Sequence, residues 1–178
     1  MKNRRIALIA GLSALACLTA PIAFGQTYPT KTIKLVVPFP AGGATDMVSR
    51  VVAQQLGIEL GQSVVVENRA GAAGTIGSEM VARAAPDGYT ILIATSSTHT
   101  IGPLLNPKIP YSPTKDFTPI MFLASSPQVV VVPLSSPAKT MPELIDYIKK
   151  NPGKLNFGSA GTGGIPHLSA ERFLAMTG

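Results

Sequence analysis

Glycines and hydroxyl-bearing residues gather at two places in the chain, and a helical pattern follows each of them. The first is 38–46, Pro-Phe-Pro-Ala-Gly-Gly-Ala-Thr-Asp, and the second is 157–164, Phe-Gly-Ser-Ala-Gly-Thr-Gly-Gly. A glycine-rich turn that enters a helix presents unpaired backbone N–H groups and the positive end of the helix dipole. Such a place suits a small anion. We therefore predict that the two turns face each other across a cleft and hold a carboxylate.

In the first turn, backbone and side chains could both contact a ligand. Gly42 and Gly43 permit positive φ angles and let a ligand approach the backbone. Thr45 can donate a hydroxyl, and either Thr45 or Asp46 is expected to be the N-cap of the helix. Asp46 could instead pair with a cationic group on a ligand. A plain strand-to-helix turn would explain this turn equally well.

The second turn offers hydroxyls from Ser159 and Thr162, while Gly161, Gly163 and Gly164 free the backbone. His167 follows at a helix start, where it could line the cleft or satisfy local backbone groups. A third small-residue loop, 68–74, is a further candidate wall. For that loop, close packing of a helix on a strand is the stronger explanation.

The sequence does not match most of the motifs that identify enzymes. Gly71-x-x-Gly74-x-x-Gly77 is not the dinucleotide-binding pattern, and no phosphate-loop lysine follows any of the turns. Phe157 stands where a nucleophile elbow around Ser159 would need glycine. His99 and His167 are the only histidines, His99 is expected to be structural, and no spacing predicts zinc. We predict no catalytic residue, no metal and no cofactor, although an α/β enzyme acting on an anionic small molecule remains the alternative.

Residues 1–25 have the pattern of a cleaved signal peptide. A basic start precedes the apolar stretch 6–18, and Ala23-Phe24-Gly25 resembles a cleavage site. A transmembrane helix is the alternative, and lipidation of Cys17, the only cysteine, is left open by a poor surrounding motif. Residues 26–178 carry 12 basic and 9 acidic residues, net +3, with no tryptophan, which argues against a nucleic-acid surface. Export without disulfides favours the periplasm.

Residues 33–94 alternate strand and helix patterns. Strands are predicted at 33–37, 63–67 and 90–94, and helices at 46–60 and 75–85. Val48, Val51, Val52 and Leu56 are expected to form the buried stripe of the first helix. This order predicts an α/β fold with a parallel, doubly wound sheet, in which ligands bind beyond the carboxyl ends of the strands.

A second lobe is expected after about residue 125. The proline-rich 96–119 reads as an irregular crossing with at most a short helix. Strands are predicted at 120–124, 128–132 and 154–158, and helices at 141–150 and 167–176. Thr140 and Glu143 form a capping box at the first of these helices. Ala170, Phe173 and Leu174 are expected to be the buried face of the second. The predicted domains are thus a signal peptide, 1–25, a first lobe, 26–125, and a partial second lobe, 126–178.

Six motifs, in order, resemble the Bug-type periplasmic receptors of tripartite tricarboxylate transporters. They include Val36-Val37-Pro38-Phe39-Pro40-Ala41-Gly42-Gly43-x-Thr45-Asp46 and Gly161-Thr162-Gly163-Gly164-x-x-His167-Leu168. The other four lie at 28–31, 66–74, 86–90 and 115–120. The resemblance covers essentially all of the mature chain.

The resemblance implies a two-lobed, type II periplasmic binding protein that closes on a small carboxylate and delivers it to a membrane permease. It places ligand contacts at Phe39, Pro40, Ala41, Gly42, Gly43, Thr45 and Asp46, and at Ser159, Gly161, Thr162, Gly163 and His167. Because family members are much longer, the chain resembles a fragment that ends inside the second lobe. A non-functional fragment is therefore a third interpretation, and we expect 26–178 to aggregate because an unfinished sheet exposes its edges.

Overall fold

The computed structural model describes residues 27–159 and 161–177. The predicted signal peptide and Cys17 lie outside these residues. The chain divides into two units at residue 30, and every helix and strand below belongs to the unit 31–178. Within the described part, no helix is both long enough and apolar enough to span a bilayer.

A three-stranded parallel sheet confirms the predicted α/β fold. Its strands are β1 (Ile33–Val37), β2 (Val64–Asn68) and β3 (Thr90–Leu92), in the order β2-β1-β3. Leu35 lies opposite Val66 on one side and Ile91 on the other. The central strand β1 is almost wholly buried, as its continuous apolar sequence predicts for a sheet covered on both faces. The third strand ends at Leu92, two residues earlier than expected.

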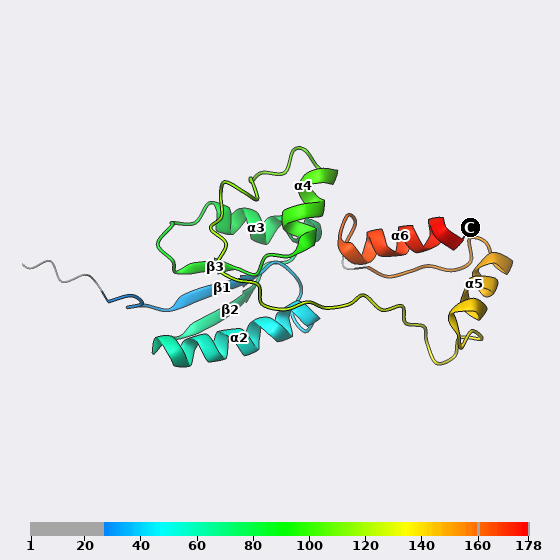
Figure 1. Cartoon of the computed structure of the whole chain (residues 1–178), viewed down its shortest axis with the longest axis horizontal. Helices are drawn as coiled ribbons and strands as arrows, with labels where there is room; N and C mark the ends of the chain where they lie inside the picture. The colour runs from blue at the N-terminus through cyan, green and yellow to red at the C-terminus, as the bar shows by residue number, and fades with distance from the viewer. Residues whose placement is uncertain (1–26, 160, 178) are drawn as a thin grey trace, which may run out of the picture. The chain divides into compact units, whose positions relative to one another are not determined.

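Two helices sandwich this sheet. Figure 1 shows α2 (Ala44–Leu60) along one face and α3 (Thr75–Ala82) along the other. Leu35, Val37, Ala53 and Ile93 form the core cluster, to which α2 contributes Ala53. This alternation of strand and helix brings the carboxyl ends of β1 and β2, and the turns that follow them, to one edge of the sheet.

The start and the buried face of α2 differ from the prediction. Gly43, rather than Thr45 or Asp46, is the N-cap. The residues buried on this helix are Asp46, Ser49 and Ala53, whereas Val51 is 62% exposed. Small side chains on the inner face let the helix lie close to the sheet, a feature that counting apolar residues does not detect.

Short irregular helices lie in the loops. A 3-10 turn, Ala72–Gly74, precedes α3, which ends three residues earlier than expected. The expected crossing after β3 begins with a π-helical turn, Ser97–Ile101, and a single α-helical turn, α4 (Gly102–Leu105). The prediction of at most a short helix in this crossing is therefore confirmed.

Beyond residue 120 the helices form, and the strands do not. The helix α5 (Met141–Lys150) starts with the predicted capping box of Thr140 and Glu143, and α6 (Ile165–Thr177) follows. No strand forms at 120–124, 128–132 or 154–158, so these three predictions are wrong for the described chain. A strand needs a neighbour to complete its hydrogen bonds, and the described residues supply none here.

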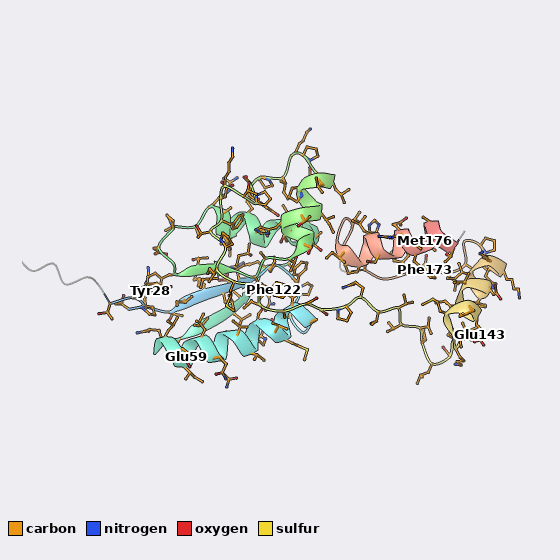
Figure 2. The ribbon with its side chains drawn as sticks, in the orientation of Figure 1. Tyr28, Glu59, Phe122, Glu143, Phe173 and Met176 are labelled. Atoms are coloured by element: carbon orange, nitrogen blue, oxygen red, sulfur yellow. The ribbon has the colours of Figure 1, made fainter. Side chains whose placement is uncertain are left out.

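Apolar side chains of this region are correspondingly exposed. Phe122, which Figure 2 shows on an extended stretch of chain, is 80% exposed, and Val131 is 82% exposed. The predicted buried face of α6 is also wrong, because no residue of this helix is fully buried and Leu174 is 37% exposed.

Candidate ligand-binding site

A cavity of about 510 Å³ lies at the carboxyl ends of β1 and β2. Three segments line it: 38–40 after β1, 70–74 after β2, and 161–162 before α6. Its volume lies within the range of small-molecule sites, roughly 300–1,000 Å³. Both predicted glycine-rich turns therefore contribute to one cavity.

Only part of the first turn faces this cavity. Pro38 is fully buried directly after β1, and Phe39 and Pro40 complete the wall. The remaining predicted contacts of this turn lie outside the lining; they are Ala41, Gly42, Gly43, Thr45 and Asp46. Gly42 has a φ of +84°, whereas Gly43 has a φ of −77°, so of these two glycines only Gly42 adopts a positive φ.

The carboxylate of Asp46 is held by groups around the start of its own helix, α2. The residue is only 3% exposed, and its carboxylate accepts hydrogen bonds from Gly42 N at 2.9 Å, Arg50 Nε at 3.0 Å and Asn68 Nδ2 at 2.9 Å. Donation from Arg50, Gly42 and Asn68 lowers the pKa of Asp46 from 3.8 to about 2. The carboxylate is therefore ionised and already has three donors.

The loop after β2 is the largest part of the cavity wall, although its sequence gave the weaker signal. Four consecutive residues, Gly71 to Gly74, have positive φ angles, including Ala72 and Ala73 at +47° and +53°. A Cβ added at Gly74 would lie 2.5 Å from Thr98 Cγ2 and 3.2 Å from Phe39 Cζ. This loop therefore both packs closely and lines the cavity. The spacing of its glycines was the sequence feature that pointed to it.

The second turn contributes Gly161 and Thr162. A Cβ on Gly161 would lie 3.6 Å from Ala73 N, so this glycine lies against the 70–74 wall. Gly161 N donates to Ser159 Oγ, and Gly163 N donates to His167 Nδ1, both at 3.4 Å. Ser159, Gly163 and His167 support this turn locally and do not line the cavity.

Ser97 is a residue that sequence reasoning missed. It is 6% exposed, and its hydroxyl oxygen accepts a hydrogen bond from Ile165 N, at the start of α6, at 3.1 Å. The contact joins positions 68 residues apart. No local pattern encodes such a pair, although the run of serine and threonine after β3 was a weak signal.

His99 belongs to an aromatic cluster. Its ring packs edge-on against Phe117 at 4.7 Å and lies 6.0 Å from the ring of Tyr111. Burial lowers the pKa of His99 below its usual 6.5. The structural role expected for this histidine agrees with these contacts, since His99 does not line the cavity.

The cavity lining contains no charged side chain among the described residues. Proline, alanine and glycine dominate, with one aromatic ring and one hydroxyl. An anion at such a site would depend on backbone N–H groups, the Thr162 hydroxyl and bridging water. The arrangement offers recognition by dipoles and shape and contains no nucleophile paired with a base.

Comparisons with known proteins identify the family of the chain. Residues 48–178 match the model of the tripartite tricarboxylate transporter family receptor. Protein BugT of Bordetella pertussis is 40% identical over 177 residues, which are 99% of this chain and 54% of that protein. The chain spans about half the length of the curated relatives it matches.

Solved structures resemble this chain to a similar degree in sequence. R. palustris Rpa4515 with adipate is 39% identical with a TM-score of 0.81, and the match covers 84% of this chain and 50% of that one. MatC (Rpa3494) from Rhodopseudomonas palustris with bound malate is 35% identical with a TM-score of 0.78, covering 84% and 51%. The chain therefore belongs to the family of tripartite tricarboxylate transporter receptors.

Proposed function

We propose that this chain carries the ligand-binding region of a periplasmic receptor for a small carboxylate, which it delivers to a permease of the tripartite tricarboxylate type. The observation that carries the proposal is the cavity in which the turn after β1 meets the glycine-rich turn before α6. The adipate and malate named for two similar structures are both dicarboxylates, which supports this ligand class.

Within the cavity, the first-turn contacts are Phe39 and Pro40, and the second-turn contacts are Gly161 and Thr162. The backbone of 70–74 forms the remaining wall. The predicted contacts outside the lining, such as Gly43 and His167, act by shaping the two turns. A lining without formal charge leaves the choice of carboxylate to cavity shape and to the spacing of N–H donors.

Periplasmic location and the permease partner rest on family membership and on the signal-peptide pattern of residues 1–25. The family is one of receptors, which supports binding without turnover. Consumption of a bound compound would instead favour the alternative of an α/β enzyme.

Isothermal titration of the chain with adipate and malate tests the proposal, with the uncharged diamide of adipate as the control ligand. A bound carboxylate should also raise stability by about 2.7 kcal/mol at a hundredfold excess over Kd. Thr162→Phe should obstruct the cavity and abolish this gain. Thr114→Phe, at an exposed threonine outside the lining, should leave it unchanged.

Failure of all mono-, di- and tricarboxylates to bind the folded wild-type chain would overturn the proposal. Equal loss of binding in the Thr162 and Thr114 variants would also contradict the assignment of this cavity.

A further inference from the structure

Two walls of the cavity are joined by one side chain that lies outside the cavity. Asn68 is the last residue of β2, directly opposite Val37, the last residue of β1. Its Nδ2 donates to the Phe39 carbonyl oxygen at 3.1 Å and to Asp46 Oδ1 at 2.9 Å. Phe39 belongs to the first wall, and the 70–74 wall begins two residues after Asn68.

The amide group of Asn68 has one arrangement that satisfies all its neighbours. Arg50 Nη2 donates to Asn68 Oδ1 at 3.3 Å, so the oxygen faces a cation. The nitrogen faces a carbonyl and a carboxylate, both of which only accept. Rotating the amide by half a turn would oppose oxygen to two acceptors and nitrogen to a donor.

Asp46 and Arg50 hold this amide through a second set of bonds. Arg50 Nε donates to Asp46 Oδ2 at 3.0 Å, one helical turn away on α2, and the same oxygen accepts from Gly42 N at 2.9 Å. The network thus joins three elements: the first turn, the start of α2 and the end of β2. A charge-assisted network of this kind restricts each of its members more than separate bonds would.

We propose that Asn68, held by Asp46 and Arg50, is a positioning residue that fixes the Phe39 wall of the cavity against the 70–74 wall. Its donation to the Phe39 carbonyl is required for full carboxylate affinity, a role that rests on the proposed function. Asp46 then acts through Asn68 and Gly42 and makes no contact with the ligand.

An exchange of the two side chains separates positioning from general stability. Asn68→Asp alone places two carboxylates together and should destabilise the fold. The double variant Asp46→Asn with Asn68→Asp restores an amide beside a carboxylate and keeps an anion near Arg50. It leaves the Phe39 carbonyl without a side-chain donor, because an ionised aspartate only accepts.

We therefore expect the double variant to recover most of the thermal stability that the single variant loses. Its affinity for adipate or malate should remain roughly tenfold below wild type, the equivalent of one lost hydrogen bond. Hydrogen exchange of ligand-free protein should be faster at 38–43 and 69–75 in the double variant than in wild type. Asn106→Asp is the matched control, since its side-chain oxygen accepts from Lys108 N and the site is exposed.

Wild-type affinity and wild-type exchange in the double variant would overturn the positioning role. If wild type binds no carboxylate while exchange at 38–43 still rises in the double variant, the proposed function fails and the positioning of the wall stands. Equal acceleration across the whole chain would mean that the network serves only general stability, and this too would overturn the inference.

Discussion

The substitution Gly77→Ala tests how closely α3 must approach the cavity wall. Gly77 is buried in α3, and a Cβ there would lie 2.8 Å from Arg69 O and 2.9 Å from both Cα and Cβ of Pro38. Two of these three atoms belong to the backbone, so neither can rotate away. Pro38 lines the cavity, and the clash would therefore displace α3, the wall or both.

The expected cost follows from two opposing terms. Alanine gains about 1 kcal/mol over glycine inside a helix. Overpacking costs about 1–3 kcal/mol, and three contacts below 3.0 Å favour the upper end. We expect Gly77→Ala to lower the free energy of unfolding by about 2 kcal/mol, the difference between these terms.

Urea unfolding of the chain measures this change, with Gly57→Ala in α2 as the control. The same helix gain applies to Gly57, and its closest contact would be 3.2 Å, to Gln62 O. That variant should stay within about 1 kcal/mol of wild type. A Gly77 variant that is more stable than wild type would refute the reasoning, because it would mean that α3 has room to spare beside Pro38.

Three further predictions concern charge and exposed surface. The pKa of Asp46 is lowered from 3.8 to about 2, so its ionised carboxylate stabilises the fold fully above pH 3.8, and this contribution is lost as pH falls toward 2. Thermal melts of Asp46→Asn should lack this acid-dependent loss of stability. Burial lowers the pKa of His99, so protonation favours unfolding and stability should decline as pH falls below 6.5, less so in His99→Phe. Residues 26–178 should self-associate in light scattering because exposed apolar side chains such as Phe122 and Val131 lack cover, and a monodisperse monomer with a sharp cooperative melt would contradict this.

Local patterns predicted the first half of the fold well. The strand β1 has the bounds expected from its apolar run, and the parallel order follows from alternating strands and helices. The prediction of the buried face of α2 was wrong because burial on this helix depends on how near it lies to the sheet. Ser49 and Ala53 permit that approach, and their low hydrophobicity conceals it.

The failed strand at 128–132 has a different cause. Its β-branched residues favour an extended backbone, and the structure does leave this stretch without helix. A strand also requires hydrogen bonds to a neighbour, and propensity carries no information about whether one is present. Within the described residues, β2 and β3 pair only with β1, so no strand is paired with this stretch.

In the candidate site, too, features set by local sequence were predicted, and features set by long-range contacts were not. The turns at 38–46 and 157–164 were predicted because glycine chemistry is local, and both reach the cavity. The bond between Asn68 and Asp46 joins residues 22 positions apart, and that between Ile165 and Ser97 joins residues 68 apart. Sequence identified Asp46 as a candidate, but only these partners distinguish a ligand contact from a residue that shapes the turn.

Under the proposed function, the positions of the charged groups explain why residues outside the cavity should influence ligand affinity. The buried carboxylate of the first turn, Asp46, pairs with Arg50 and accepts from two uncharged donors, so its charge is balanced within the fold. The cavity lining itself carries no charged group among the described residues. A carboxylate held without a cationic partner depends on several N–H groups that converge at fixed separations, and movement of one wall weakens the hydrogen bonds that this wall donates. Under the proposed function, we expect Asn68, which sets one separation, and Gly77, which sets how near α3 lies to Pro38, to influence affinity without contacting the ligand.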